Sequence, residues 1–205
     1  MSMVIELGKL PLLLDETHGT LALPPVTDAQ FYEFCQRNPL INAERTAKGN
    51  IHLMPPAEAW TDSRGSDLLI DLGIWNRALP KPGITFGASA GFKLPNGAIR
   101  APDVSWVSQA RWDALTDETR FPYPHLCPDF VGEVMSPSDR VGEAKAKMEE
   151  YRDNGARLGW LVDRKSRTVY VYRPNAPVET VTDPASLGGD PELPGFVADL
   201  RRVFA

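Results

Sequence analysis

Two carboxylates interrupt segments that otherwise read as buried strands. Asp103 lies in "APDVSWVS" and Glu133 lies in "LCPDFVGEVMSPSD". An ionised carboxylate without a partner is disfavoured inside a strand of this kind, so it is normally protonated, paired or bound to a metal ion. Two carboxylates that converge from adjacent strands would form an oxygen-rich site suited to Mg²⁺ or Mn²⁺. The alternative is that each carboxylate pairs with an arginine or caps a turn.

A lysine follows these strands on a predicted helix over residues 140–154, which Gly155 would end. At about 100° per residue, one side of this helix is apolar and contains Ala144, Met148 and Tyr151. Lys147 lies beside that side, whereas Lys145 lies nearer Glu149 and Arg152. We therefore expect Lys147 to point inward. The alternative is a solvated lysine paired with Glu150, three residues further along.

The elements that must position these residues form an alternating pattern. Helices are predicted in 26–39 and 61–80, and a hairpin that turns at Lys48-Gly49-Asn50 is predicted between them. The centre of the chain reads as strands, with a short helix and a proline-rich loop over 109–126. After the helix at 140–154, two strands are predicted in "LGWLVD" and "TVYVYRP". This order predicts an α/β (α+β) fold with a mixed sheet.

We expect one domain over residues 1–205, with a core at about 26–175 and a loop-rich tail at 176–205 that ends in a small edge element. A chain of 205 residues is long enough for such a core. Its two cysteines are too few for a disulfide framework, and no apolar run is long enough to span a bilayer. The cytoplasm is the expected compartment. A net charge of −5 argues against a protein that coats nucleic acid, but not against an enzyme with a local basic groove.

Several of these segments, taken in order, resemble a known family. They are "NAERTAKGNIHLMPP", "GFKLPNGAIRAPDVSWVSQARW", "CPDFVGEVMSPSD", "KMEEYRDNGARLGWLVDRKSRTVYVYRP" and "LPGF". Together they resemble the Uma-type family of restriction endonucleases, which belongs to the PD-(D/E)XK nuclease superfamily and was formerly a domain of unknown function. The resemblance extends from about Val26 to the C-terminus. It implies a central mixed β-sheet flanked by helices, with the active site at one end of the sheet.

The resemblance also assigns roles to residues of this chain. Asp103 matches the first metal carboxylate of the family and Glu133 the second. The residue two positions after Glu133 is Met135 rather than lysine, so the simple motif is broken. The family lysine matches Lys147, four residues before the helix tyrosine. Glu44, in "NAERTA", matches an early acidic position that can assist at the metal in the wider superfamily.

The resulting hypothesis is hydrolysis of phosphodiester bonds, most directly in DNA, by a metal-dependent endonuclease. Asp103, Glu133 and the carbonyl of Val134 would hold Mg²⁺ or Mn²⁺, and Lys147 would orient the nucleophile or stabilise negative charge. Two alternatives stay open: a catalytically silent nuclease-like domain that binds nucleic acid or a protein, and a hydrolase of RNA or a small nucleotide. By resemblance, a homodimer is possible, with the loop "RFPYPHLCP" as its contact.

Overall fold

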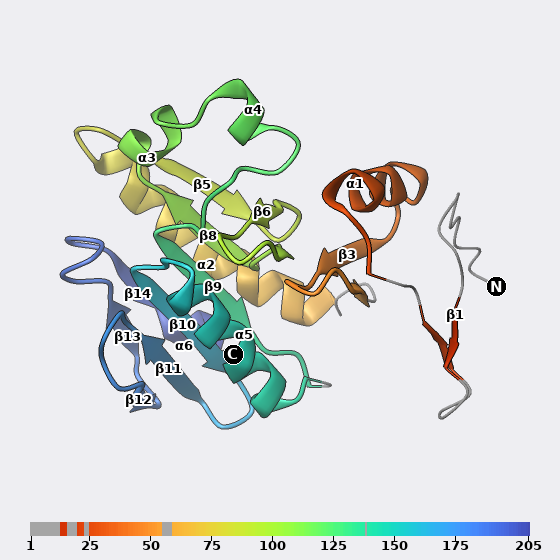
Figure 1. Cartoon of the computed structure of the whole chain (residues 1–205). Helices are drawn as coiled ribbons and strands as arrows, with labels where there is room; N and C mark the ends of the chain where they lie inside the picture. Colours follow the sequence, from red (N-terminus) through yellow and green to blue (C-terminus); the bar gives the residue numbers. More distant parts are fainter. Residues whose placement is uncertain (1–12, 16–19, 23–24, 55–58, 138) are drawn as a thin grey trace.

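A computed structural model describes residues 13–15, 20–22, 25–54, 59–137 and 139–205 of the chain (Figure 1). Its helices are α1 Asp28–Arg37, α2 Ala59–Ala78, α3 Gln109–Asp113, α4 Asp117–Arg120, α5 Val141–Asp153 and α6 Leu200–Val203. Its strands are β1 Leu13–Asp15, β2 Thr20–Ala22, β3 Asn42–Arg45, β4 Ile51–Met54, β5 Ile84–Gly87, β6 Phe92–Lys93, β7 Ile99–Arg100, β8 Val104–Val107, β9 Phe130–Val134, β10 Leu158–Asp163, β11 Thr168–Tyr172, β12 Glu179–Thr182, β13 Ser186–Gly188 and β14 Val197–Asp199.

A six-stranded mixed sheet with the order β12-β11-β10-β9-β8-β5 forms the centre of the molecule. Strands β9 and β10 pair in parallel, and the other neighbours in this sheet pair antiparallel. Because parallel neighbours cannot be joined by a tight turn, the chain crosses from β9 to β10 through α5. The predicted mixed sheet flanked by helices is therefore confirmed.

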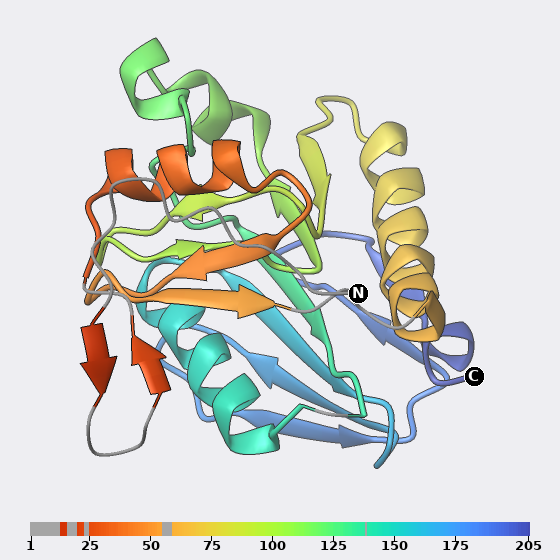
Figure 2. The same cartoon turned by 90° about the vertical axis from the view of Figure 1, so that its right-hand side faces the viewer.

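The two faces of this sheet are packed against different helices. Along β8, β9 and β10 successive side chains alternate between the faces, as they must in a strand. Val104, Phe130 and Trp160 pack on one face with Leu68 and Leu72 of α2 and with the C-terminal segment. Side chains of the opposite face pack with Met148 and Tyr151 of α5. Figure 2 shows α2 and α5 on opposite sides of these strands.

A second sheet, with the order β4-β3-β7-β6, lies beside the first. Strands β3 and β4 form the predicted hairpin, and Gly49 adopts a φ of +86° in its turn, a conformation that favours glycine. Helix α1 precedes this hairpin and is capped by Thr27, whose side chain accepts the Gln30 amide. The register Arg45↔Ile99 joins β3 to β7. This pairing brings the segment around Glu44 to the segment that leads into Asp103.

The predicted helices and strands are present where the structure describes the chain, with two differences. The segment 109–126 contains α4 in addition to the expected short helix. The tail at 176–205 is not simply loop-rich: it forms β12, β13, β14 and α6, and it contributes fully buried side chains to the core. Single-domain organisation stays a prediction. Pro55 and Pro56, at the end of the predicted hairpin, lie outside the described residues.

None of the helices in the described part of the chain combines the length and the apolar character needed to cross a membrane.

Candidate active site

The register of β8 and β9 brings the two predicted carboxylates together. Val104 lies opposite Gly132 in this antiparallel pair, so Asp103 and Glu133 occupy the next opposing positions. Both side chains lie on the face that is covered by α5, because each is one residue away from a side chain that packs on the α2 face. The Val134 amide donates a hydrogen bond of 2.8 Å to Oδ2 of Asp103. This bond fixes Asp103 at the end of β9, beside Glu133.

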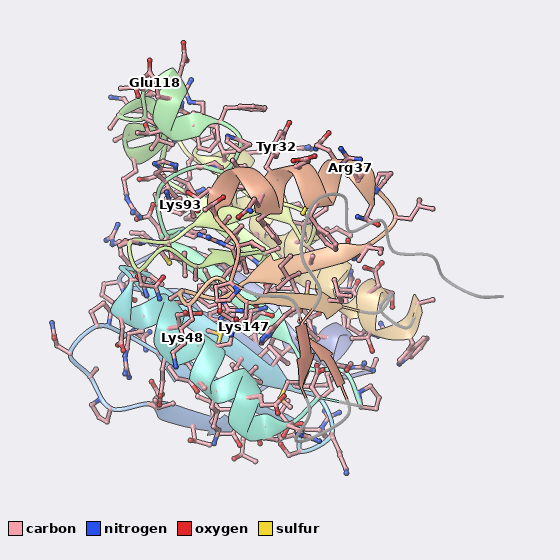
Figure 3. All side chains as sticks on the ribbon, turned by 45° about the vertical axis from the view of Figure 1, so that its right-hand side comes forward. Tyr32, Arg37, Lys48, Lys93, Glu118 and Lys147 are labelled. Carbon is pink, nitrogen blue, oxygen red and sulfur yellow. The ribbon has the colours of Figure 1, made fainter. Side chains whose placement is uncertain are left out.

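Lys147 reaches this point from α5. Its Nζ lies 2.8 Å from Oε1 of Glu133 and 3.0 Å from Oε1 of Glu44. Figure 3 shows Lys147 between α5 and the strands of the second sheet. Its side chain is 20 % exposed, and the ammonium group lies between the two glutamates. The expectation that Lys147, rather than Lys145, points inward is confirmed, and Lys145 instead lies over the ring of Tyr170.

Glu44 is held from several directions at once. Its side chain is 4 % exposed. Oε1 accepts the Ala101 amide at 2.9 Å as well as the Lys147 ammonium, and Oε2 accepts Nη1 of Arg100 at 3.0 Å. The register Arg45↔Ile99 explains the contact with Arg100, because it places residues 44 and 100 opposite each other on β3 and β7. Both oxygens of this carboxylate are therefore engaged by the protein.

Arg100, Glu150 and Tyr151 complete the arrangement, and none of them was predicted to belong to the site. Nε of Arg100 lies 2.6 Å from Oε2 of Glu150, so Glu150 pairs with this arginine and not with Lys147 as the alternative reading had it. The hydroxyl of Tyr151 donates a bond of 3.0 Å to Oε1 of Glu133. The place of Tyr151 one turn after Lys147 predicts that its ring faces the sheet, but no local pattern links its hydroxyl to Glu133 or links Arg100 to Glu44.

Burial dominates the electrostatics of the two strand carboxylates. It raises the pKa of Glu133 to about 8; Lys147 opposes this effect, and the charges of Asp103 and Glu44 add to it. Burial also raises the pKa of Asp103, against the opposing effects of the Val134 amide and Lys147. For Glu44, burial is outweighed by Lys147, Arg100 and the Ala101 amide, which together lower its pKa. Burial would lower the pKa of Lys147, but Glu133 and Glu44 raise it above its ordinary value.

The donor set fits a hard divalent cation with few protein ligands. In the part of the chain that the structure describes, no group of three or more histidine, cysteine, aspartate or glutamate side chains is placed to hold a metal ion. Asp103 and Glu133 are two oxygen donors, and Mg²⁺ commonly binds through one or two carboxylates while keeping several waters. Burial raises the pKa of both groups, and a bound cation would favour their ionised forms.

The structure thus brings together four residues predicted from the sequence: Glu44, Asp103, Glu133 and Lys147. Val134 contributes its amide to Asp103, and a role for its carbonyl as a metal ligand stays a prediction. Such a group of carboxylates and a lysine, at one end of the inner strands of a mixed sheet, is the arrangement expected of a nuclease of the restriction-endonuclease type.

Comparison with known proteins gives the family. Residues 28–201 match the model of the Uma2 family, which is described as "Putative restriction endonuclease", and the chain belongs to this family. No curated protein matches the chain. A crystal structure of a protein from Anabaena variabilis ATCC 29413, described as "a putative nuclease belonging to DUF820", superposes with a TM-score of 0.72 at 19 % identity. The match covers 88 % of this chain and 98 % of the other, and it shows a shared fold.

Proposed function

We propose that this chain is a metal-dependent endonuclease that hydrolyses phosphodiester bonds in DNA. Membership of the family and the nuclease fold support a nuclease in general. The observation that carries the finer proposal is the placement of Asp103 opposite Glu133, beside the ammonium group of Lys147. These are oxygen donors for a cation and a fixed positive charge for a phosphate, gathered on one face of the sheet.

Asp103 and Glu133 would hold Mg²⁺ or Mn²⁺, with the Val134 carbonyl as a further proposed donor. The charges of the site favour this assignment. Four carboxylates, those of Glu44, Asp103, Glu133 and Glu150, face two cations, Arg100 and Lys147, and Asp139 adds negative charge near Asp103. A divalent ion would offset part of this excess of negative charge. When bound, such an ion supplies charge to polarise a phosphate and lowers the pKa of a water.

Lys147 would act as a cation and not as a base. Its pKa is raised above the ordinary lysine value by the two glutamates, so the amine stays protonated at neutral pH. A protonated amine donates hydrogen bonds, and it can therefore stabilise the negative charge that develops on a phosphate or orient an attacking water. To meet a phosphate, the ammonium group would turn from one of the two glutamates with which it is paired.

A homodimer is part of the proposal, and the loop at 120–128 offers only part of the expected contact. Phe121 is 68 % exposed and lies with its ring centroid 5.8 Å from that of Tyr32. Leu126 and Cys127 are buried in the core. A second copy of the chain could therefore meet residues 120–125 of this loop but not residues 126–128.

The test combines Mn²⁺ titration calorimetry with plasmid nicking on the same protein samples. Wild type and Glu143→Gln, which removes an exposed carboxylate of α5 outside the site, should bind Mn²⁺ and nick DNA. Glu133→Gln should lose both activities. Metal binding without nicking of DNA, but with cleavage of RNA or a nucleotide, would replace the substrate in this proposal. Absence of Mn²⁺ binding in the wild type would overturn it.

One observation favours the silent domain as a second candidate. Lys147 pairs with both Glu44 and Glu133, so the described site satisfies part of its own charge without a metal ion. A domain that binds nucleic acid or a protein without catalysis would need no more than this. Such a domain would show no metal-dependent change in the titration and no cleavage of any nucleic acid.

A further inference from the structure

The position of Lys147 depends on groups outside the metal-binding pair. We infer that Glu44 is a positioning residue that anchors Lys147, with Arg100 and Glu150 behind it, and that it is not a ligand of the metal ion. This inference rests on the proposed function, because it assigns a role within the same reaction. It differs from the role that the family resemblance suggested for Glu44.

The protein itself engages both oxygens of the Glu44 carboxylate. Oε1 already accepts from the Ala101 amide at 2.9 Å and from Lys147 at 3.0 Å, and Oε2 accepts from Arg100 at 3.0 Å. The residue is only 3 % exposed. A metal ion bound through Oε1 would displace the Ala101 amide or the buried Lys147, and an ion bound through Oε2 would share that oxygen with the guanidinium of Arg100; both arrangements are costly. Asp103, by contrast, has one oxygen bonded to an amide and none bonded to a cation among the described contacts.

Arg100, which binds Glu44, is itself held in place by Glu150. Its Nε bonds to Oε2 of Glu150 at 2.6 Å, while Oε1 of Glu150 accepts the side-chain amide of Asn96 at 2.9 Å. Arg100 is 12 % exposed and binds Oε2 of Glu44, whereas Lys147 and the Ala101 amide bind Oε1. Glu150 lies three residues after Lys147 on α5. Helix α5, which carries Lys147, is therefore bonded through Glu150 to both Asn96 and Arg100 in the segment that leads into Asp103.

The anchor would hold the ammonium group of Lys147 at a fixed distance from the two proposed metal ligands, Asp103 and Glu133. Without Glu44, the remaining ion pair of Lys147 would be the one with Glu133. The ammonium group would then compete with the metal ion for that carboxylate. With Glu44 in place, the ammonium group is shared between two carboxylates and can leave Glu133 without losing all its partners. The anchor thus allows cation and lysine to act side by side.

The experiment compares Glu44→Gln and Arg100→Gln with wild type and with Glu143→Gln as the control. Three quantities are measured: Mn²⁺ affinity, the kcat and KM of plasmid nicking, and the rate at which Lys147 is labelled by an amine reagent, followed by peptide mass spectrometry with Lys145 as the internal reference. We expect nicking kcat to fall by about tenfold or more in both variants, with KM unchanged. Labelling of Lys147 should rise about threefold or more in both variants. Glu44→Gln removes the charge of its partner, and Arg100→Gln removes the contact that holds the Glu44 side chain in place. Mn²⁺ affinity should stay within about threefold of wild type, because neither residue is a ligand.

Two results would overturn the inference. A loss of Mn²⁺ affinity in Glu44→Gln as large as that in Glu133→Gln would make Glu44 a ligand. Unchanged labelling of Lys147 in both variants would show that Glu44 does not hold it. Arg100→Gln leaves the Glu44 carboxylate in place, so it tests the anchor even where Glu44→Gln folds poorly. If wild type neither binds Mn²⁺ nor cuts DNA, the proposed function fails, while the labelling result still decides whether Glu44 holds Lys147.

Discussion

Glu133 shows how a carboxylate is accommodated inside a sheet. Its side chain is 14 % exposed, and a single oxygen, Oε1, accepts from both Lys147 and Tyr151. Burial nevertheless raises its pKa to about 8, so these partners do not fully compensate for the lost hydration. The sequence analysis could predict that Glu133 needs a partner. It could not predict the tyrosine, because the apolar periodicity of α5 describes the ring and not the hydroxyl.

The stability of the metal-free protein should fall as the pH rises, owing to Glu133. Its folded pKa of about 8 lies above the ordinary value of 4.5, so between these values the folded state holds a proton that the unfolded state has lost. Stability is therefore lost progressively from about pH 4.5 to about pH 8. In Glu133→Gln this loss should be smaller, by about 1 kcal/mol or more between pH 5 and pH 8. Urea unfolding in a chelator measures it, and parallel pH profiles for both proteins would contradict the expectation.

Asp103→Asn should abolish metal-dependent cleavage without unfolding the protein. The amide side chain retains an oxygen that can accept the Val134 amide, so the end of β9 stays in place. The lost charge should lower the nicking rate by about a hundredfold or more. Because burial disfavours the ionised carboxylate, the metal-free variant should melt at or above the wild-type temperature. Asp113→Asn, which changes an exposed carboxylate on α3, is the control, and unchanged nicking in Asp103→Asn would reject the assignment.

At the scale of elements, α5 links the two sheets at the site. Its apolar side predicted correctly which lysine points inward, because Met148 and Tyr151 must face the sheet and Lys147 lies next to them. The anchor behind Lys147 could not be predicted in this way. Arg100 and Glu44 are 56 residues apart and meet through a pairing between two short strands, whose register no local pattern specifies.

Met148→Ala should destabilise the protein and disturb the site together. The side chain of Met148, on α5, is fully buried against β10. Its truncation leaves a cavity between helix and strand and should lower the free energy of unfolding by about 2–5 kcal/mol. Since Lys147 is the adjacent residue, nicking should also slow at temperatures where the variant is folded. Val141→Ala, at a position 38 % exposed at the start of the same helix, should change neither property. A destabilised Met148→Ala protein with wild-type nicking would separate α5 packing from catalysis.

At the scale of the whole molecule, the C-terminal segment completes the core on the α2 face. The sequence analysis expected a loop-rich tail there because its strands are short and its glycines and prolines obscure any periodicity. In the structure, Phe196 stacks on Trp160 with a centroid distance of 5.4 Å, and the Trp75 Nε1 bonds to the Pro194 carbonyl. The order of elements predicted the central sheet. What covers one of its faces depends on contacts between segments far apart in the sequence.

Phe196→Ala should therefore be strongly destabilising, by about 3–5 kcal/mol, because it removes a fully buried ring that contacts three other aromatic side chains. Chemical unfolding monitored by tryptophan fluorescence gives the value. The neighbouring Val197→Ala, at a position 56 % exposed, should have a small effect. Equal stability of the two variants would mean that the tail is not part of the cooperative unit.

The distribution of the site along the chain sets the order in which it can arise during synthesis. A ribosome releases Glu44 and Arg100 early, then Asp103 and Glu133, and Lys147 only with α5. Strand β10, against which α5 packs, follows later still, and β9 gains its parallel neighbour only then. A nascent chain that stalls before α5 carries Glu44, Asp103 and Glu133 but neither Lys147 nor the complete central sheet. The proposed nuclease activity would thus be withheld until both α5 and β10 have been synthesised.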